Sequence, residues 1–393
     1  MSENVKLLLL YVAICLVIVA RVAVEKNGYT TPDSVHYINA AQSIVDKGTL
    51  YYEDNDEVQF FSLWPAGYPL SIAFVHFVTD FSLLWCSKIV NLLWLLLAFF
   101  IIKKNYPAHA TWVALVFCAN SMLENFSYTW SEGGFMVCLL WFCLEAYKLA
   151  TDQRSSTMRI VKVIGAGILV FLYRYVGGFV LALISLLGIW TITQKKYKRV
   201  IYLCFAGLLI AGGIVAYFSF ISANTGHYSG ATRVSPDETV SFLLTKLFQA
   251  QLNEFLLIRK ISFVSFDPLA FLLLLFQVLL ISISFYRMKN INEWRTIIAV
   301  RSSDSKPLFL ALSALIYWSI IVVLRLFIMK FDVFDFRILA PASLLLLLAL
   351  HMYLADSSRI ILLKKIQVPI SIIYLLALAH GLYKKNLFEL LLG

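Results

Sequence analysis

Long apolar runs recur along the whole chain, and they constrain its fold more than any other feature of the sequence. Runs of Leu, Ile, Val and Phe alternate with short segments in which the charged residues are gathered. As α-helices, runs of roughly 20 residues match the thickness of a bilayer. Apolar residues make up 61% of the chain and charged residues 14%, which is more apolar surface than one soluble core can bury. We therefore predict an all-α polytopic membrane protein.

About eleven of these runs are long enough to be candidate membrane spans. The sequence has no internal repeat, no low-complexity tract and no soluble domain at either end. We therefore predict a single transmembrane domain over residues 1–393. The candidate spans lie near residues 5–24, 83–102, 107–123, 131–150, 160–173, 175–193, 200–222, 267–286, 307–329, 337–355 and 366–383.

Lys and Arg are concentrated in alternate short loops, and this pattern predicts the orientation of the chain. Basic residues favour cytoplasmic loops, and a cytoplasmic N-terminus places the loops around Lys103 and Arg199 inside. Two long loops, residues 25–82 and 223–266, then lie outside. Loops of this length commonly carry function, so we expect the functional site on the non-cytoplasmic face. The lack of a eukaryotic retention signal favours a bacterial inner membrane.

The net charge and the cysteines exclude other classes of protein. The charge of +10 is explained by the basic cytoplasmic loops, and no soluble basic patch with interleaved aromatics is present to bind nucleic acid. All six cysteines fall within apolar runs, without the spacing of a disulfide framework or a zinc site. We therefore expect membrane lipids as partners and no nucleic acid.

The first external loop contains the signals of two interfacial helices. Thr31 suits an N-cap, Pro32 the first helical position and Gly48 a C-terminal stop, which predicts a helix between them. A second apolar run follows the segment from Trp64 to Pro69 and ends near Asp80; it is short for a span. We predict that both helices lie at the membrane surface and cap the bundle.

Four segments stand out by their order and spacing along the chain. They are Asp33 and Tyr37 with Gly48 and Trp64-Pro65-Ala66-Gly67-Tyr68-Pro69, then Ser131-Glu132-Gly133-Gly134-Phe135, then Tyr173-Arg174-Tyr175-Val176-Gly177, and last Phe336-Arg337-Ile338-Leu339-Ala340-Pro341. Together they resemble the GT-C class of membrane glycosyltransferases, and they are most similar to glycosyltransferase family 39 enzymes of the protein O-mannosyltransferase and lipid A aminoarabinose transferase type. The resemblance covers most of residues 1–345 and implies a GT-C bundle.

The resemblance implies transfer of a sugar from a polyprenyl phosphate donor to a lipid, glycan or protein acceptor at the outer face. An inverting single displacement of this kind needs a base for the acceptor and positive charge for the departing phosphate. Asp33 is the candidate base and Arg337 the main phosphate ligand, with Arg174 and Glu132 in support. Tyr37, Tyr68 and His36 are further candidate substrate contacts. Neither the sugar nor the acceptor follows from the sequence.

Each candidate also has a purely structural explanation. An acid in a first helical turn, such as Asp33, is stabilised by the helix dipole, and His36 fits the polar face of an interfacial helix. Glu132 could hold a divalent metal ion together with Asp33, or simply face the headgroups. Glu124, nearby, is predicted to be a loop acid without a role.

The two arginines also have explanations that involve no substrate. Arg174 lies between two predicted spans and could snorkel from an external turn, because burial in the bilayer is costly. Arg337 offers the planar fork that suits phosphate, but it could pair with Asp332 or Asp335 instead.

Two other functions remain open. A transporter or flippase of lipid-linked sugars would more commonly show internal repeats and charges near the midplane, whereas here the polar groups are concentrated at one face. A polysaccharide polymerase or ligase would share external arginines and polyprenyl-linked substrates, but the segment from Asp33 to Pro69 favours a transferase.

Overall fold

The computed structural model describes residues 1–393 except 55–56, 153–156, 229–238, 289–304, 329–333 and 383–393. Nine helices within these ranges are long and apolar enough to cross a membrane, which confirms the all-α polytopic architecture. They are α1 (Glu3–Val24), α4 (Leu83–Asn105), α7 (Glu132–Thr151), η2 with α9 (Tyr175–Phe179, Val180–Thr193), α10 (Tyr197–Thr225), α12 (Pro268–Arg287), α14 with η4 (Ser305–Val323, Leu324–Ile328), α15 (Phe336–Leu354) and α16 (Ile360–Gly381).

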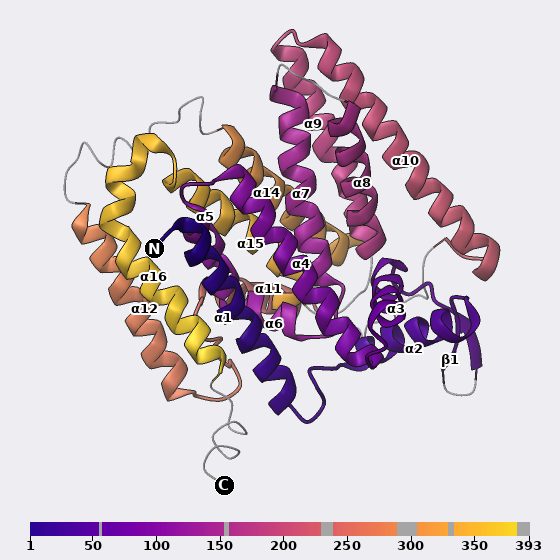
Figure 1. Ribbon diagram of the computed structural model, residues 1–393, viewed down its shortest axis with the longest axis horizontal. Helices are drawn as coiled ribbons and strands as arrows, with labels where there is room; N and C mark the ends of the chain where they lie inside the picture. Colours follow the sequence, from indigo (N-terminus) through magenta and orange to yellow (C-terminus); the bar gives the residue numbers. More distant parts are fainter. Residues whose placement is uncertain (55–56, 153–156, 229–238, 289–304, 329–333, 383–393) are drawn as a thin grey trace.

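The most buried of these helices form the centre of the bundle. Buried residues make up 89% of the apolar window of α7 and 78% of that of α15, against 17% in α10 and 22% in α12. Figure 1 shows α8 (Thr157–Tyr173), α9 and α10 as a group on one side, and the pair α12 and α16 on the other. The central helices therefore have protein on most sides, whereas α10 and α12 present wide apolar faces suited to lipid.

Two predicted spans differ in the structure. The segment 160–173 belongs to α8, which has 17 residues and lies at the short end of the range for a span. The segment 107–123 is not one helix but α5 (Ala110–Ala114), η1 (Leu115–Cys118) and the start of α6 (Asn120–Ser127). Irregular backbone is tolerated at this depth because the surrounding helices bury it. The amide of Asn120, at the break, donates to the carbonyl of Leu257 at 2.8 Å.

Both helices predicted in the first long loop are present. Helix α2 (Pro32–Lys47) begins after Thr31, whose side chain and that of Ser34 form a capping box, and ends at Gly48 with a positive φ of 65°. Helix α3 (Gly67–Thr79) ends at Asp80. The second long loop contains α11 (Val240–Phe255).

The acidic stretch between α2 and α3 forms an antiparallel hairpin that the sequence analysis did not predict. Its strands are β1 (Tyr51–Asp54) and β2 (Glu57–Phe60), and Tyr51 pairs with Phe60. The rings of Tyr51 and Phe60 also contact each other edge to face. Pairing of this kind stabilises a short ribbon that the charges alone would not predict.

Two glycines allow α8 to approach its neighbours closely. A Cβ on Gly67 would lie 2.5 Å from the carbonyl oxygen of Leu172, and one on Gly134 would collide with the ring of Tyr173. Both contacts involve the end of α8, immediately before Arg174. The glycines of α3 and α7 thus determine where Arg174 lies relative to these helices.

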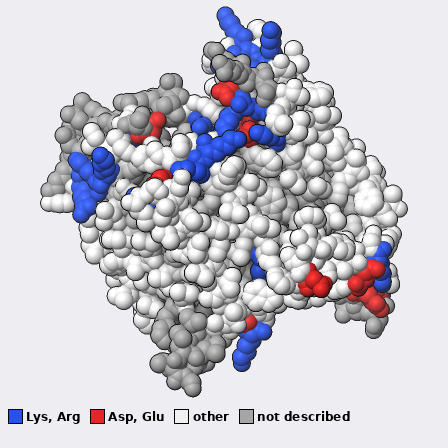
Figure 2. All heavy atoms as spheres, in the orientation of Figure 1, with Lys and Arg blue, Asp and Glu red and all other residues white. Residues whose placement is uncertain are grey.

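Charged side chains are segregated between the two ends of the bundle. In Figure 2 most of the visible Lys and Arg atoms lie at the upper end, with some Asp and Glu among them, and further Asp and Glu atoms lie at the lower end, on the side that carries α2 and the hairpin. The surface between them is almost free of charge in this view. This distribution is the one expected of a chain whose middle contacts lipid.

Candidate active site

Four charged residues from distant parts of the chain meet at the end of the bundle that carries α2. Nη1 of Arg337 donates to Oδ2 of Asp33 at 2.5 Å, and its Nε lies 3.4 Å from Oε1 of Glu132. Arg174 forms an ion pair with the same oxygen of Glu132. The side chains of Glu132 and Arg337 are 3% and 11% exposed, whereas those of Asp33 and Arg174 are 22% and 20% exposed. The cluster is therefore largely buried, with Asp33 and Arg174 most open to a ligand.

Helix starts position three of the four residues. Asp33 lies in the first turn of α2, Glu132 is the first residue of α7, and Arg337 is the second residue of α15. Asp335 caps α15 by accepting from the amide of Ile338 at 3.0 Å. Helix N-termini carry partial positive charge and unpaired amide donors, so two arginines beside three such termini provide a setting suited to an anion.

Arg174 occupies the extended turn between α8 and η2. Burial lowers its pKa, but the adjacent charge of Glu132 raises it, and the pKa lies above its ordinary value. Arg174 thus stays charged at any working pH. The snorkelling alternative does not describe its position, because its guanidinium points to an acid within the protein.

Trp130 forms one wall of the cluster. The guanidinium of Arg337 lies 5.1 Å from the centre of its ring, and its indole nitrogen donates to the hydroxyl of Thr31 at 2.9 Å. The Trp130 ring stacks on Tyr128 at 3.9 Å. Attraction between a guanidinium and an aromatic ring favours positions over the ring face, so Trp130 restricts the orientation of the Arg337 guanidinium.

The other three predicted contacts form hydrogen bonds to neutral polar groups near the cluster. The hydroxyl of Tyr37 lies 3.1 Å from that of Ser131, next to Glu132. Tyr68 is fully buried, and its hydroxyl donates to Asn91 of α4 at 3.3 Å. Nδ1 of His36 lies 2.9 Å from the hydroxyl of Tyr52. Burial and then the charge of Glu132 raise the pKa of Tyr37, so its phenol stays neutral and can serve as a hydrogen-bond donor.

Of the two acids predicted as alternative partners of Arg337, the structure describes only Asp335. Asp335 lies 4.0 Å from its Nε, farther than Asp33 or Glu132. Asp332 lies outside the described residues. Among the acids that the structure describes, those nearest to Arg337 come from α2 and α7, and they are too far away in the sequence for the pairing to be predicted from it.

A second charged cluster, also missed by sequence reasoning, lies beside the first. Glu124 of α6 is ion-paired with Lys260, and Arg21 approaches its other oxygen at 3.8 Å. The prediction that Glu124 is a loop acid was wrong, because Glu124 lies within helix α6. The ammonium of Lys260 also lies over the ring of Phe336, the residue before Arg337. Its position after α11 places the second long loop next to the candidate site.

Glu254 of α11 is a buried acid near Lys260, and it should make stability depend on pH. Burial raises its pKa to about 7, although Ser343, Lys260 and Ser121 oppose this effect. Because the pKa is raised in the folded protein, folding is favoured at low pH, and stability should fall as the pH rises from about 4.5 to about 7. At 1.36 kcal/mol per pKa unit the loss is on the order of 3 kcal/mol. Glu254→Gln should remove this decline in a thermal unfolding series.

The matched control for this series is Glu57→Gln, at an exposed position of the hairpin. Its unfolding temperature should follow that of the wild type at every pH. Parallel curves for Glu254→Gln and the wild type would contradict a raised pKa at Glu254.

The residues present fit a divalent metal ion poorly. Arg337 binds both Asp33 and Glu132, so a cation between these acids would have to displace a guanidinium. The described residues also hold no group of three His, Cys, Asp or Glu side chains arranged to bind a metal.

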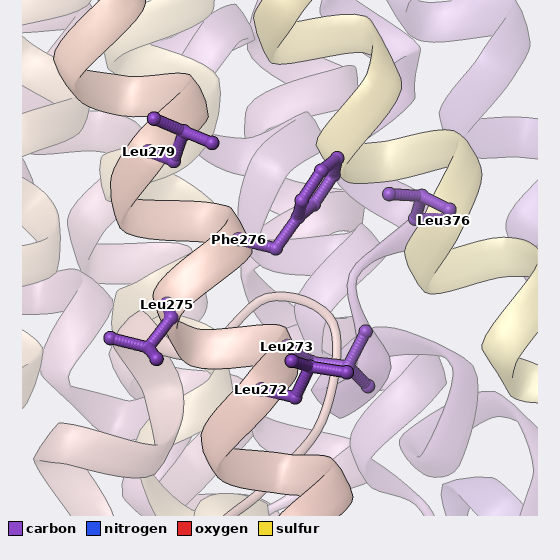
Figure 3. A pocket seen from close by; sticks show the side chains of 6 residues that line it. All are labelled: Leu272, Leu273, Leu275, Phe276, Leu279 and Leu376. Atoms are coloured by element: carbon purple, nitrogen blue, oxygen red, sulfur yellow. The ribbon is translucent and has the colours of Figure 1, made fainter.

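An apolar groove of about 480 Å³ lies away from these charges, between α12 and α16. Figure 3 shows Phe276 of α12 and Leu376 of α16 in the space between the two helices, whereas Leu275 projects from the other side of α12. It shares no residue with either cluster. Its lining consists of Leu272, Leu273, Leu275, Phe276, Leu279 and Leu376. Such a surface suits a hydrocarbon chain and offers no group for chemistry.

The chain is similar to two solved structures of ArnT from Cupriavidus metallidurans. The apo structure is 13% identical with a TM-score of 0.47, and the similarity covers 93% of this chain and 78% of that chain. The structure bound to undecaprenyl phosphate is 13% identical with a TM-score of 0.45, covering 92% and 78%. No protein-family model and no curated protein matches the chain. These similarities assign no activity and no residue role to it.

Proposed function

We propose that this chain is a membrane glycosyltransferase of the GT-C type, which moves a sugar from a polyprenyl phosphate donor to a lipid, glycan or protein acceptor. One observation carries the proposal. Two acids and two arginines from separate segments converge at one end of the helix bundle. At such an end a membrane-bound substrate would meet the aqueous phase. The motifs of the first loop, of α7, of the Arg174 turn and of α15 support the same assignment.

The arginines are suited to hold the phosphate of the donor. A guanidinium binds phosphate oxygens through parallel N–H donors, and it stays charged throughout the reaction. Arg337 and Arg174 both approach Oε1 of Glu132, so a phosphate near this atom would meet both. The negative charge that develops on the leaving phosphate is then stabilised by donors already in place.

Asp33 is suited to accept the proton of the acceptor. In a single displacement the acceptor oxygen or nitrogen forms a bond to the anomeric carbon while the bond from that carbon to the phosphate oxygen breaks. The acceptor proton passes to Asp33, and the electron pair of the broken bond leaves with the lipid phosphate. Inversion follows because attack and departure occur on opposite faces of the sugar.

The ion pair of Asp33 and Arg337 makes the availability of the base depend on donor binding. Before the donor binds, Oδ2 of Asp33 accepts from Arg337. A phosphate competes with this carboxylate for the same guanidinium donors. Donor binding therefore draws Arg337 away and leaves Asp33 able to accept a proton, so the base becomes available only when there is a sugar to transfer.

We place the site on the non-cytoplasmic face of a bacterial inner membrane, with the N-terminus inside. The support is the concentration of Lys and Arg at the opposite end of the bundle. The groove between α12 and α16 is our proposed surface for part of the polyprenyl tail, because its lining is entirely apolar.

The test is sugar transfer by the purified protein in nanodiscs, with a panel of synthetic polyprenyl phosphate sugars and lipid, glycan and peptide acceptors. We expect turnover of at least one donor, release of the polyprenyl phosphate, and a product with inverted anomeric configuration. Added EDTA should leave the rate unchanged, since two arginines supply the positive charge.

Binding or translocation of the lipid without consumption, with every acceptor offered, would contradict the proposal and favour a flippase. Loss of turnover with EDTA, restored by a divalent cation, would instead place a metal in the reaction and revise the roles of Asp33 and Glu132.

A further inference from the structure

A buried lysine in α4 joins two chain segments that lead into the site. Lys88 is 1% exposed. Its ammonium donates to the carbonyl of Ser127 at 2.8 Å, to the hydroxyl of Thr129 at 2.7 Å and to the carbonyl of Tyr29 at 3.3 Å. Among the residues that the structure places, no acid forms an ion pair with it. All three N–H donors of the ammonium have acceptors, so Lys88 is a fixed clamp and not a ligand-binding group.

The two segments held by Lys88 carry the two acids of the cluster. Tyr29 lies two residues before Thr31, the cap of α2, and four residues before Asp33. Ser127 is the last residue of α6, and Thr129 lies in the turn between α6 and α7 that leads directly to Glu132. The amide of Thr129 also donates to the carbonyl of Tyr29 at 3.1 Å. Lys88 therefore sits at the point where the approaches to the two acids touch.

Bonds beyond the clamp connect the same two segments up to the site. The hydroxyl of Ser34 donates to the carbonyl of Thr129 at 3.0 Å, and Trp130 donates to Thr31. The hydroxyls of Tyr37 and Ser131 form a third such hydrogen bond. Each of these bonds joins the first turns of α2 to the turn before α7. A shift of the turn at Thr129 would pass directly to Asp33 and Glu132.

Helix α4 provides a firm support for this clamp. Ser87, beside Lys88, lies 2.8 Å from the hydroxyl of Thr129. One turn further on, Asn91 donates to the carbonyls of Phe126 and Tyr128 at 3.2 and 2.8 Å. Three polar residues in a mainly apolar helix thus face one short turn of the chain. Burying an ammonium without an acid is unfavourable unless its donors are satisfied, and here they are satisfied only by the two segments that it joins.

We propose that Lys88 is a positioning residue that fixes Asp33 and Glu132 relative to each other. The inference rests on the proposed function. Arg337 and Arg174 come from α15 and from the turn after α8, whereas the three bonds of the Lys88 ammonium run to the segments of the acids. Loss of the ammonium therefore displaces the acids directly, and it reaches the arginines only through their contacts with these acids and with Trp130. Turnover should suffer while donor binding persists.

The experiment compares Lys88→Met with Lys104→Met, at an exposed position of the same helix. Turnover is measured in nanodiscs, and the affinity for polyprenyl phosphate by titration calorimetry. Misplacement of reacting groups by about 1 Å can cost roughly 100-fold in rate, so we expect the turnover of Lys88→Met to fall about 100-fold. The Kd for polyprenyl phosphate should stay within about threefold of the wild type. Lys104→Met should match the wild type in both.

A second pair of variants covers the case that Lys88→Met does not fold. Thr129→Val removes the hydroxyl that accepts from Lys88, and Thr129→Ser retains it. We expect turnover to fall about tenfold in Thr129→Val and to be restored in Thr129→Ser. Full turnover in Thr129→Val, or a loss of donor affinity equal to the loss of turnover in a folded Lys88→Met, would overturn the inference.

Failure of the proposed function can be told apart from failure of the clamp. If the wild type transfers no sugar, hydrogen–deuterium exchange reports on the clamp without substrate. In Lys88→Met, exchange should rise in residues 29–37 and 127–135 together and stay unchanged in residues 336–345. Unchanged exchange in the first two segments would overturn the clamp whatever the activity of the chain.

Discussion

Asp33→Asn should lower the turnover of sugar transfer about 1,000-fold while the protein still folds and binds its donor. A positioned general base contributes roughly 100- to 10,000-fold, and an amide cannot accept the acceptor proton. The amide also removes the charge that pairs with Arg337. Because that guanidinium is then less occupied, the affinity for polyprenyl phosphate should stay equal or increase. Loss of turnover together with unchanged or tighter donor binding is the expected signature.

The matched control is Asp46→Asn, in the last turns of the same helix. Asp46 is exposed and accepts from Gln42 at 2.8 Å, far from the charged cluster. Its turnover should equal that of the wild type. Stability should change little in either variant, since an acid in the first helical turn contributes only about 0.3–1 kcal/mol. Turnover above a tenth of the wild type in Asp33→Asn would rule out Asp33 as the base.

Helix boundaries in the first loop could be predicted because they depend on local chemistry. Thr31, Pro32 and Gly48 act within one turn of their own positions, and the structure places α2 between them. The broken segment 110–127 could not be predicted in the same way. Its composition suits a span, and only the surrounding helices make an interruption at Asn120 tolerable.

The members of the candidate site could be named from the sequence, but their contacts could not. The pairing of Arg337 with Asp33 joins residues 304 positions apart. Nearby acids such as Asp335 gave a simpler local explanation of the same arginine. The role of Lys88 could not be predicted from the sequence, because a single lysine within an apolar run is also compatible with a membrane span. Its role depends on two turns that come together only in the folded chain.

Arg337→Met should weaken the binding of polyprenyl phosphate about 10- to 100-fold and reduce transfer by at least as much. Hydrogen bonds to charged groups contribute about 1.5–3 kcal/mol, which corresponds to this range of affinity. Methionine fills much of the same volume without donors, so the wall formed by Trp130 remains. The affinity is measured by titration in nanodiscs, and Arg287→Met, an exposed arginine of α12, is the control.

Arg337→Lys separates charge from geometry. Lysine keeps one positive charge but offers a compact ammonium instead of a planar fork. If the guanidinium must release Asp33 and bind phosphate in the same step, Arg337→Lys should retain part of the donor affinity and lose most of the turnover. Donor affinity and turnover equal to those of the wild type in Arg337→Lys would show that only a positive charge is needed at this position. Unchanged donor affinity in Arg337→Met would move the phosphate site away from α15, and Arg174 would then be the next arginine to test.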